Sequence, residues 1–134
     1  MGRLDEVEGI GKVYARKLKE AGVGSTRALI EKGATAKGRK ELAKKARVSE
    51  KLILEWVNHV DLFRIRGIAS EYADLLEEAG VDTVRELAQR KPENLFQKLE
   101  MINQEKKLVR RLPTVDQVRD WVEQAKRLPG IISY

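Results

Sequence analysis

The sequence contains no cysteine and a single histidine, His59. Without cysteine the chain has no disulfide, no thiolate metal ligand and no cysteine nucleophile, and one imidazole excludes any site that needs two. No apolar run approaches the roughly 20 residues of a membrane helix, and acidic residues near the N-terminus stand where a secretory signal would be apolar. We therefore expect a cytoplasmic protein with no membrane partner. The same absences remove most hydrolase and metalloenzyme designs.

Positive charge is what the sequence has in excess. Its 134 residues include 27 Lys and Arg against 21 Asp and Glu, which gives a net charge of +6 and a pI near 9.6. This excess favours an anionic partner such as nucleic acid. It is unevenly distributed, because residues 1–62 hold 14 basic against 9 acidic side chains, whereas residues 63–134 hold 13 against 12. We therefore expect an anion to bind in the first half of the chain.

The chain contains two copies of one unit. The stretch GIGKVYARKLKEAGVGSTRAL (residues 9–29) aligns with GIASEYADLLEEAGVDTVREL (residues 67–87) at an offset of 58 residues. Further along, SEKLILEWV (residues 49–57) aligns with TVDQVRDWV (residues 114–122) at an offset of 65. The second copy therefore carries an insertion of 7 residues, which we place within residues 98–113.

The periodicity inside each copy is helical. Val13, Tyr14, Leu18 and Ala21 fall on one stripe, and Gly22 follows them where a left-handed C-cap is expected. No stretch shows sustained alternation of apolar and polar residues, so we expect no strands. Side chains suited to capping helix N-termini recur along both copies. They are Ser25 or Thr26, Thr35, Ser49, Thr83 and Thr114.

The aromatic residues allow two interpretations. Trp56 and Trp121 could be platforms on which bases stack, or they could belong to the core. Their matching positions on apolar stripes favour the core, and we interpret Tyr14 and Tyr72 in the same way. His59 is expected to be structural rather than catalytic.

A glycine-rich motif opens the first copy. Residues 9–18 follow the pattern G-h-G-x-x-x-A-x-x-L, in which h is apolar. Gly9 and Gly11 allow positive φ angles and a close approach of the backbone to a ligand, and Ile10 is expected to anchor the loop in the core. A tight turn that only lets two helices pack closely is the alternative interpretation of this pattern.

The helix that follows the motif provides a chemistry for phosphate. The amides of Gly11, Lys12 and Val13 stand at its start and lack intrahelical acceptors. Their N–H groups and the positive end of the helix can bind a phosphate oxygen. Lys12, Arg16 and Lys19 follow at helical spacings and add positive charge toward the same ligand. Such contacts read no bases, so binding would tolerate any sequence and depend strongly on salt.

The motif resembles the helix-hairpin-helix superfamily, known for sequence-independent binding of the DNA backbone. The whole chain, including GATAKGRKELA and EKKLVRRLP, looks like a bacterial family of tandem helix-hairpin-helix proteins labelled as a domain of unknown function. The resemblance implies an all-α fold of two helix-hairpin-helix-type (SAM-like) repeats packed as one compact unit. Residues 1–62 would form the basic first repeat, and residues 63–134 a degenerate second repeat with a short insertion. It implies no activity, because none is established for that family.

The resemblance also bears on cofactors. In superfamily members with this hairpin, the loop carbonyls can hold a monovalent cation, and that cation at the first hairpin is the one cofactor we consider. We expect no other cofactor and no metal ion.

The second copy differs from the first in its charges. Ala69 replaces Gly11, Ser70 replaces Lys12, Glu71 replaces Val13 and Asp74 replaces Arg16. Carboxylates therefore stand where a phosphate would bind, and alanine makes a positive φ more costly. We interpret the second hairpin as structural, or as a contact surface for a protein partner.

A second basic cluster supports the first copy. Six basic residues lie within residues 37–47, with Glu41 as the one acid among them. They form either a second patch for phosphates or a solvated helix face. The six are Lys37, Arg39, Lys40, Lys44, Lys45 and Arg47.

Three functions compete for this sequence. A lyase needs a lysine nucleophile beside a carboxylate, and a nuclease needs several carboxylates around a metal ion; neither set can be assembled here, so we expect no enzyme. A protein-interaction scaffold is the alternative to our leading hypothesis, which is non-catalytic, sequence-nonspecific binding of nucleic acid, preferably DNA. The predicted binding residues are Gly9, Ile10, Gly11, Lys12, Val13, Arg16, Lys19, Lys37, Arg39, Lys40 and Lys44.

Overall fold

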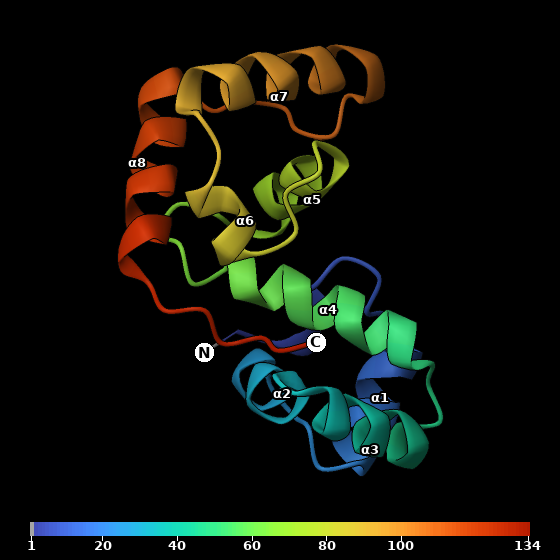
Figure 1. The fold of residues 1–134 in the computed structure, drawn as a ribbon. Helices are drawn as coiled ribbons and strands as arrows, with labels where there is room; N and C mark the ends of the chain where they lie inside the picture. The colour runs from blue at the N-terminus through green and yellow to red at the C-terminus, as the bar shows by residue number, and fades with distance from the viewer. Residues whose placement is uncertain (1) are drawn as a thin grey trace. The chain divides into compact units, whose positions relative to one another are not determined.

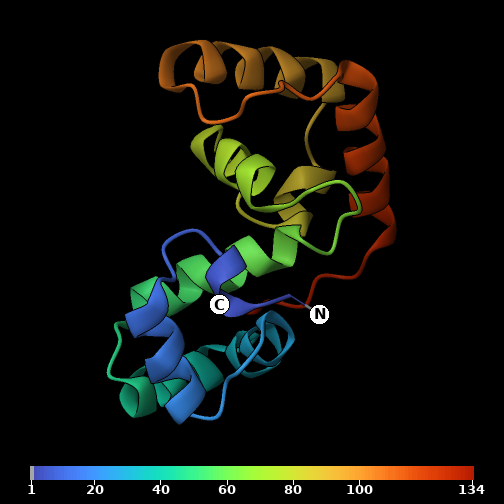
Figure 2. The ribbon, with the colours of Figure 1, turned by 180° about the vertical axis from the view of Figure 1, so that it is seen from behind.

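The computed structural model describes residues 2–134, and every regular element in this range is a helix (Figures 1 and 2). The all-α fold expected from the sequence is confirmed for these residues. A short 3₁₀ helix, η1, precedes the α-helices. The elements are η1 (Leu4–Glu6), α1 (Lys12–Glu20), α2 (Thr26–Gly33), α3 (Ala36–Ala46), α4 (Glu50–Leu62), α5 (Ser70–Glu78), α6 (Val84–Ala88), α7 (Pro92–Lys106) and α8 (Val115–Arg127).

The chain divides into two compact units. The first comprises Met1–Asp61 with Ile131–Tyr134, and the second comprises Leu62–Gly130. The boundary expected after residue 62 lies one residue from the observed one. The last four residues, which we expected in the second repeat, belong to the first unit. Hydrogen bonds described below hold those residues there.

The first long helix of each unit ends in the same way. Gly22 and Gly80 follow α1 and α5 with φ angles of +92° and +90°. The amides of these two glycines donate to the carbonyls of Lys19 and Glu77. The amides of the next residues, Val23 and Val81, donate to the carbonyls of Leu18 and Leu76, both at 2.8 Å. This is the hydrogen-bond pattern of a glycine C-cap. The stop predicted at Gly22 is therefore confirmed, and Gly80 repeats it.

The short helices that follow begin at predicted caps. The hydroxyl of Ser25 accepts a hydrogen bond from the amide of Ala28, and the hydroxyl of Thr83 accepts one from Glu86. Thr35 caps α3 through the amide of Gly38. Each bond satisfies a donor that the first turn of a helix leaves without an intrahelical partner. Local sequence signals therefore define the starts of these helices.

The two copies differ in length at three places. Helix α6 has 5 residues where α2 has 8, and α7 has 15 where α3 has 11. Both α3 and α7 end on a non-glycine residue in the left-handed conformation, Arg47 at φ +58° and Lys107 at φ +51°. The segment from Lys107 to α8 is also longer than the segment from Arg47 to α4. Most of the added length therefore lies at the end of α7 and just after it, as the alignment predicted.

The last helix of each unit carries the tryptophan. Trp56 on α4 and Trp121 on α8 are 3% and 2% exposed, which confirms the core interpretation. Each indole packs against the tyrosine of its own unit: the ring centroids are 5.1 Å apart for Tyr14 and Trp56 and 5.2 Å apart for Tyr72 and Trp121, both pairs tilted. This tilted geometry suits the quadrupoles of aromatic rings. The two units therefore share one internal arrangement.

The core of the second unit is continuous. Helix α8 packs against α6 and α7, and α7 packs against α5. The side chains they bury include Leu75, Leu76, Leu87, Leu95 and Leu99, each fully buried. In the first unit α3 packs against α1 and α2 around buried residues such as Leu18 and Leu29.

Among residues 2–134, no helix is both long and apolar enough to cross a membrane. His59 lies on α4 and is 2% exposed.

Candidate nucleic-acid interface

The first hairpin places the start of α1 at an exposed edge. Gly9 has a φ of +91°, and Ile10 is buried, with its amide donating to the carbonyl of Val7 at 3.1 Å. Gly11 is the N-cap of α1, and its carbonyl accepts from Ala15 at 2.9 Å. Gly11 itself is extended at φ −89°, so only one of the two glycines uses the positive φ that the motif allows. The anchoring role predicted for Ile10 fits this burial.

An open groove runs beside this helix start. It has a volume of about 420 Å³ and lies between η1 and α1. We call it the α1 groove, and it is lined by Arg3, Leu4, Asp5, Lys12, Ala15, Arg16, Lys19 and Gly24. The three basic residues predicted on α1 thus line one surface, and Arg3 joins them from outside the aligned repeat. Four cationic side chains against one carboxylate leave this groove with an excess of three positive charges.

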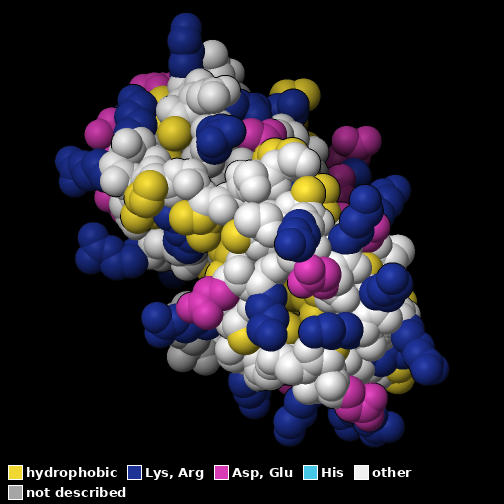
Figure 3. Space-filling model, turned by 60° about the horizontal axis from the view of Figure 1, so that its bottom comes forward, with side chains coloured by type: hydrophobic (Ala, Val, Ile, Leu, Met, Phe, Trp, Pro, Cys, Tyr) yellow, Lys and Arg dark blue, Asp and Glu magenta, His cyan; other side chains and the backbone are white. Residues whose placement is uncertain are grey.

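The charged side chains that line the α1 groove are exposed to solvent. Lys12, Arg16 and Lys19 are exposed. Arg3 forms an ion pair with Asp5 at 3.4 Å, and both side chains are more than half exposed. An exposed pair of this kind contributes little to stability, so Arg3 can exchange its carboxylate for another anion. Lys and Arg side chains are numerous on the face drawn in Figure 3, with fewer acidic ones among them.

Val13 departs from the sequence prediction. We expected it on the apolar stripe of α1, but its side chain is 67% exposed. The stripe runs instead through Leu18, which is fully buried, with Tyr14 half-buried beside it. An amphipathic stripe covers about one third of a helix surface. Val13 lies outside it because successive residues are turned by about 100° around the helix axis, which points Val13 away from the side of Tyr14. Val13 therefore lies at the mouth of the hairpin, beside Lys12.

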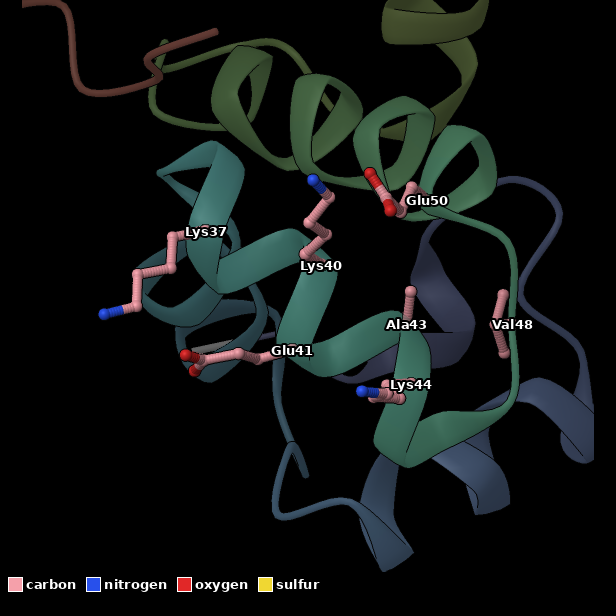
Figure 4. Close-up of a pocket in the computed structure, with 7 residues that line it drawn as sticks. All are labelled: Lys37, Lys40, Glu41, Ala43, Lys44, Val48 and Glu50. Carbon is pink, nitrogen blue, oxygen red and sulfur yellow. The ribbon is translucent and has the colours of Figure 1, made fainter.

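The basic cluster of residues 37–47 lines a different groove. This groove, about 620 Å³, lies between α3 and the start of α4 (Figure 4). We call it the α3 groove, and it is lined by Lys37, Lys40, Glu41, Ala43, Lys44, Val48 and Glu50. It shares no lining residue with the α1 groove. The sequence predicted this cluster either as a second patch for phosphates or as a solvated helix face, and three of its lysines line a groove of their own.

Arg39 does not belong to the exposed cluster. Its side chain is 5% exposed, and its guanidinium donates to the carbonyl of Gly33 at 2.8 Å and to that of Ser133 at 2.7 Å. The ring of Tyr134 lies over it, 5.8 Å from ring centroid to Cζ, within the range of a cation–π contact. Because these contacts use its donors inside the first unit, Arg39 is removed from the predicted phosphate-binding residues.

The same contacts hold the last residues of the chain in the first unit. The amide of Ser133 donates to the carbonyl of Ala34 at 2.7 Å, and Ile132 is 8% exposed. Arg39 therefore fastens Ile131–Tyr134 to the C-terminal end of α2. The sequence gave no signal for this, because the partners are 94 residues apart along the chain.

The second hairpin repeats the backbone of the first with different charges. Gly67 has a φ of +99°, and Ala69 is the N-cap of α5 at φ −110°. Alanine adopts that conformation without strain, so the expected cost of Ala69 is wrong. Glu71 is exposed on the first turn of α5, where Val13 stands in the first unit. Charge, and not backbone shape, therefore distinguishes the two hairpins.

One acidic side chain of α5 forms an ion pair with a neighbouring helix. Glu78 pairs with Lys106 of α7 at 2.5 Å, and this hydrogen bond raises the pKa of the Lys106 ammonium. Elsewhere in the second unit, burial raises the pKa of Asp82. In the described part of the chain, no group of three or more His, Asp or Glu side chains could hold a metal ion.

Comparison with known proteins gives one match. The family model described as Domain of unknown function (DUF4332) matches residues 8–128, and the chain belongs to this family. Neither a curated protein nor a solved structure matches the chain.

Proposed function

We propose that this member of the DUF4332 family binds nucleic acid without catalysis and without base specificity, DNA being the preferred ligand. One observation carries the proposal: α1 begins at Gly11 without a side-chain cap, and Lys12 in its first turn lines a groove with an excess of three positive charges. Backbone N–H groups at a helix start and nearby cations both bind phosphate oxygens. In this role the first hairpin works as a helix-hairpin-helix site, and the protein acts in the cytoplasm.

The roles of the individual residues follow from their positions. The amides of Gly11, Lys12 and Val13 bind one phosphate, since the N-terminal turn of α1 offers them no acceptor. Lys12, Arg16 and Lys19 are one turn apart along α1, so they follow the neighbouring phosphates of the same strand. Gly9 shapes the turn, Ile10 anchors it, and Arg3 adds a cation from just before η1.

Salt titration of duplex binding tests this function. We expect a labelled duplex to bind at low salt and to dissociate as salt rises, with a linear dependence of log K on log salt. Lys12→Glu with Arg16→Glu removes two phosphate contacts, so the slope should fall by about 2 and the affinity by about tenfold or more. The readout is fluorescence anisotropy, measured on duplex DNA, single-stranded DNA and RNA.

A matched variant controls for net charge. Lys98→Glu with Arg110→Glu makes the same charge change at exposed positions of the second unit. At physiological salt that variant should keep wild-type affinity within about twofold, because long-range charge is screened there. Absence of wild-type binding to any of these nucleic acids at low salt would overturn the proposal and favour the scaffold function.

A further inference from the structure

The first unit has two basic grooves, and no residue lines both. Figure 1 shows α3 in front of α1, and Figure 2, seen from behind, shows α1 in front of α3. In Figure 4 the side chains that line the α3 groove come from α3 and the start of α4, while α1 lies behind them. Nucleic acid that contacts only the lining of the α1 groove therefore leaves the α3 groove unoccupied.

The chemistry of the α3 groove suits a sugar–phosphate backbone. Lys37, Lys40 and Lys44 recur at intervals of three and four residues on α3, so they form one row along the helix. Ala43 and Val48 provide an apolar floor that a deoxyribose can contact. Against three lysines stand Glu41 and Glu50, which leaves one excess positive charge. The α3 groove therefore attracts phosphate, but less strongly than the α1 groove.

We propose that the first unit holds two nucleic-acid segments at once, one in each groove, and so bridges separate duplexes. This inference rests on the proposed function for the α1 groove and adds a second binding surface to it. Because the slope of log K against log salt grows with the number of phosphate contacts, and the two grooves differ in excess charge, each contributes its own salt dependence. Bridging needs both grooves occupied, so it is lost at lower salt than the binding of a single duplex.

A capture experiment tests bridging directly. One duplex is immobilised on beads, the protein is added, and capture of a second, fluorescent duplex from solution is measured over a salt series. Light scattering at the same concentrations measures the number of chains per particle, so that capture by a protein dimer is recognised. We expect capture at low salt, and its midpoint should lie at lower salt than that of single-duplex binding measured by anisotropy.

Two double variants separate the grooves. Lys40→Glu with Lys44→Glu should abolish capture and keep single-duplex affinity within about threefold, because the α1 groove is intact. Lys12→Glu with Arg16→Glu should abolish capture and lower single-duplex affinity by about tenfold or more. Lys98→Glu with Arg110→Glu is the charge-matched control and should keep both. Lys40→Gln with Lys44→Gln is a milder variant, which should still capture the second duplex but with a midpoint at lower salt. Circular dichroism checks that each variant is folded.

The outcomes distinguish this inference from the function on which it rests. If the wild type binds single duplexes and captures no second one, bridging is wrong and the proposed function stands. Retained capture in both the Lys40/Lys44 variants also overturns bridging, as does capture only by a dimer. A Lys40/Lys44 variant that loses single-duplex binding as fully as the Lys12/Arg16 variant means that the grooves act as one site. No binding by the wild type overturns both.

Discussion

A Cβ on Gly67 would come within 2.9 Å of the indole Nε1 of Trp121, and a Cβ on Gly9 would come within 3.4 Å of Nε1 of Trp56. Both glycines have positive φ angles, where only glycine is unstrained. Each hairpin is therefore closed by a glycine that lies against the buried tryptophan of its own unit. This contact depends on shape and not on charge, so it is compatible with the opposite charges of the two hairpins.

The first prediction concerns these glycines. Gly67→Ala should lower the free energy of unfolding by about 2–4 kcal/mol, because alanine strains the positive φ and also displaces a buried indole. Gly9→Ala should cost less, about 1–2 kcal/mol, since its contact is longer. Urea denaturation followed by tryptophan fluorescence measures both. Gly11→Ala is the control: at φ −89° and with nothing within 4 Å of an added Cβ, it should stay within about 0.5 kcal/mol of the wild type. A larger loss at Gly11 than at Gly67 contradicts the assignment.

The second prediction concerns Arg39. Arg39→Met leaves the carbonyls of Gly33 and Ser133 without their donor, and should lower the free energy of unfolding by about 2–3 kcal/mol. Arg39→Lys should recover only part of the loss, because an ammonium cannot reproduce the planar fork that reaches both carbonyls. The exposed neighbour provides the control, since Lys40→Met should change stability by less than about 0.5 kcal/mol. Equal stability of Arg39→Met and the wild type in urea contradicts the structural role.

The third prediction concerns the end of α7. Lys107 holds the left-handed conformation at φ +51°, which costs an L residue about 1 kcal/mol. Lys107→Gly removes that strain but adds freedom to the unfolded chain, so we expect a net gain of about 0.5 kcal/mol. Lys98→Gly makes the same change of charge within α7 and should cost about 1 kcal/mol. Thermal unfolding of the two variants side by side measures this difference, and a destabilised Lys107→Gly counts against the strain.

Local signals explain what could be predicted from the sequence. The caps at Ser25, Thr35 and Thr83 and the stop at Gly22 each depend on residues within five positions of one another. The core positions of both tryptophans were found because two copies of the unit carry them at equivalent places. Repetition and short-range hydrogen bonding thus sufficed for the helices and for the basic row on α1.

Contacts between distant residues explain what could not be predicted. The burial of Arg39 depends on Ser133, and a basic residue in a basic cluster carries no mark of that partner. Arg3 joins the α1 groove from the position just before η1, outside the aligned repeat. The shapes of the two grooves follow from the packing of α1 against η1 and α3, which periodicity does not encode.

The last prediction separates charge from backbone shape in the two hairpins. If charge decides, Gly11→Ala should bind a labelled duplex within about twofold of the wild type, because Ala69 adopts nearly the same conformation at the equivalent N-cap. Val13→Glu places a carboxylate beside the amides at the start of α1, as Glu71 does in the second unit, and should lower affinity by about tenfold at low salt.

The reverse exchange completes this test. Glu71→Lys removes the carboxylate from the second hairpin, and anisotropy should show affinity equal to the wild type or higher, since no phosphate contact is lost. Val13→Ala is the matched control for Val13→Glu: it shortens the same exposed side chain without adding charge and should keep most of the affinity. A loss of binding in Gly11→Ala equal to that in Val13→Glu means that the glycine itself is needed. If Glu71→Lys loses affinity for the duplex, the second hairpin takes part in binding. That result would contradict our assignment of the binding to the first unit alone.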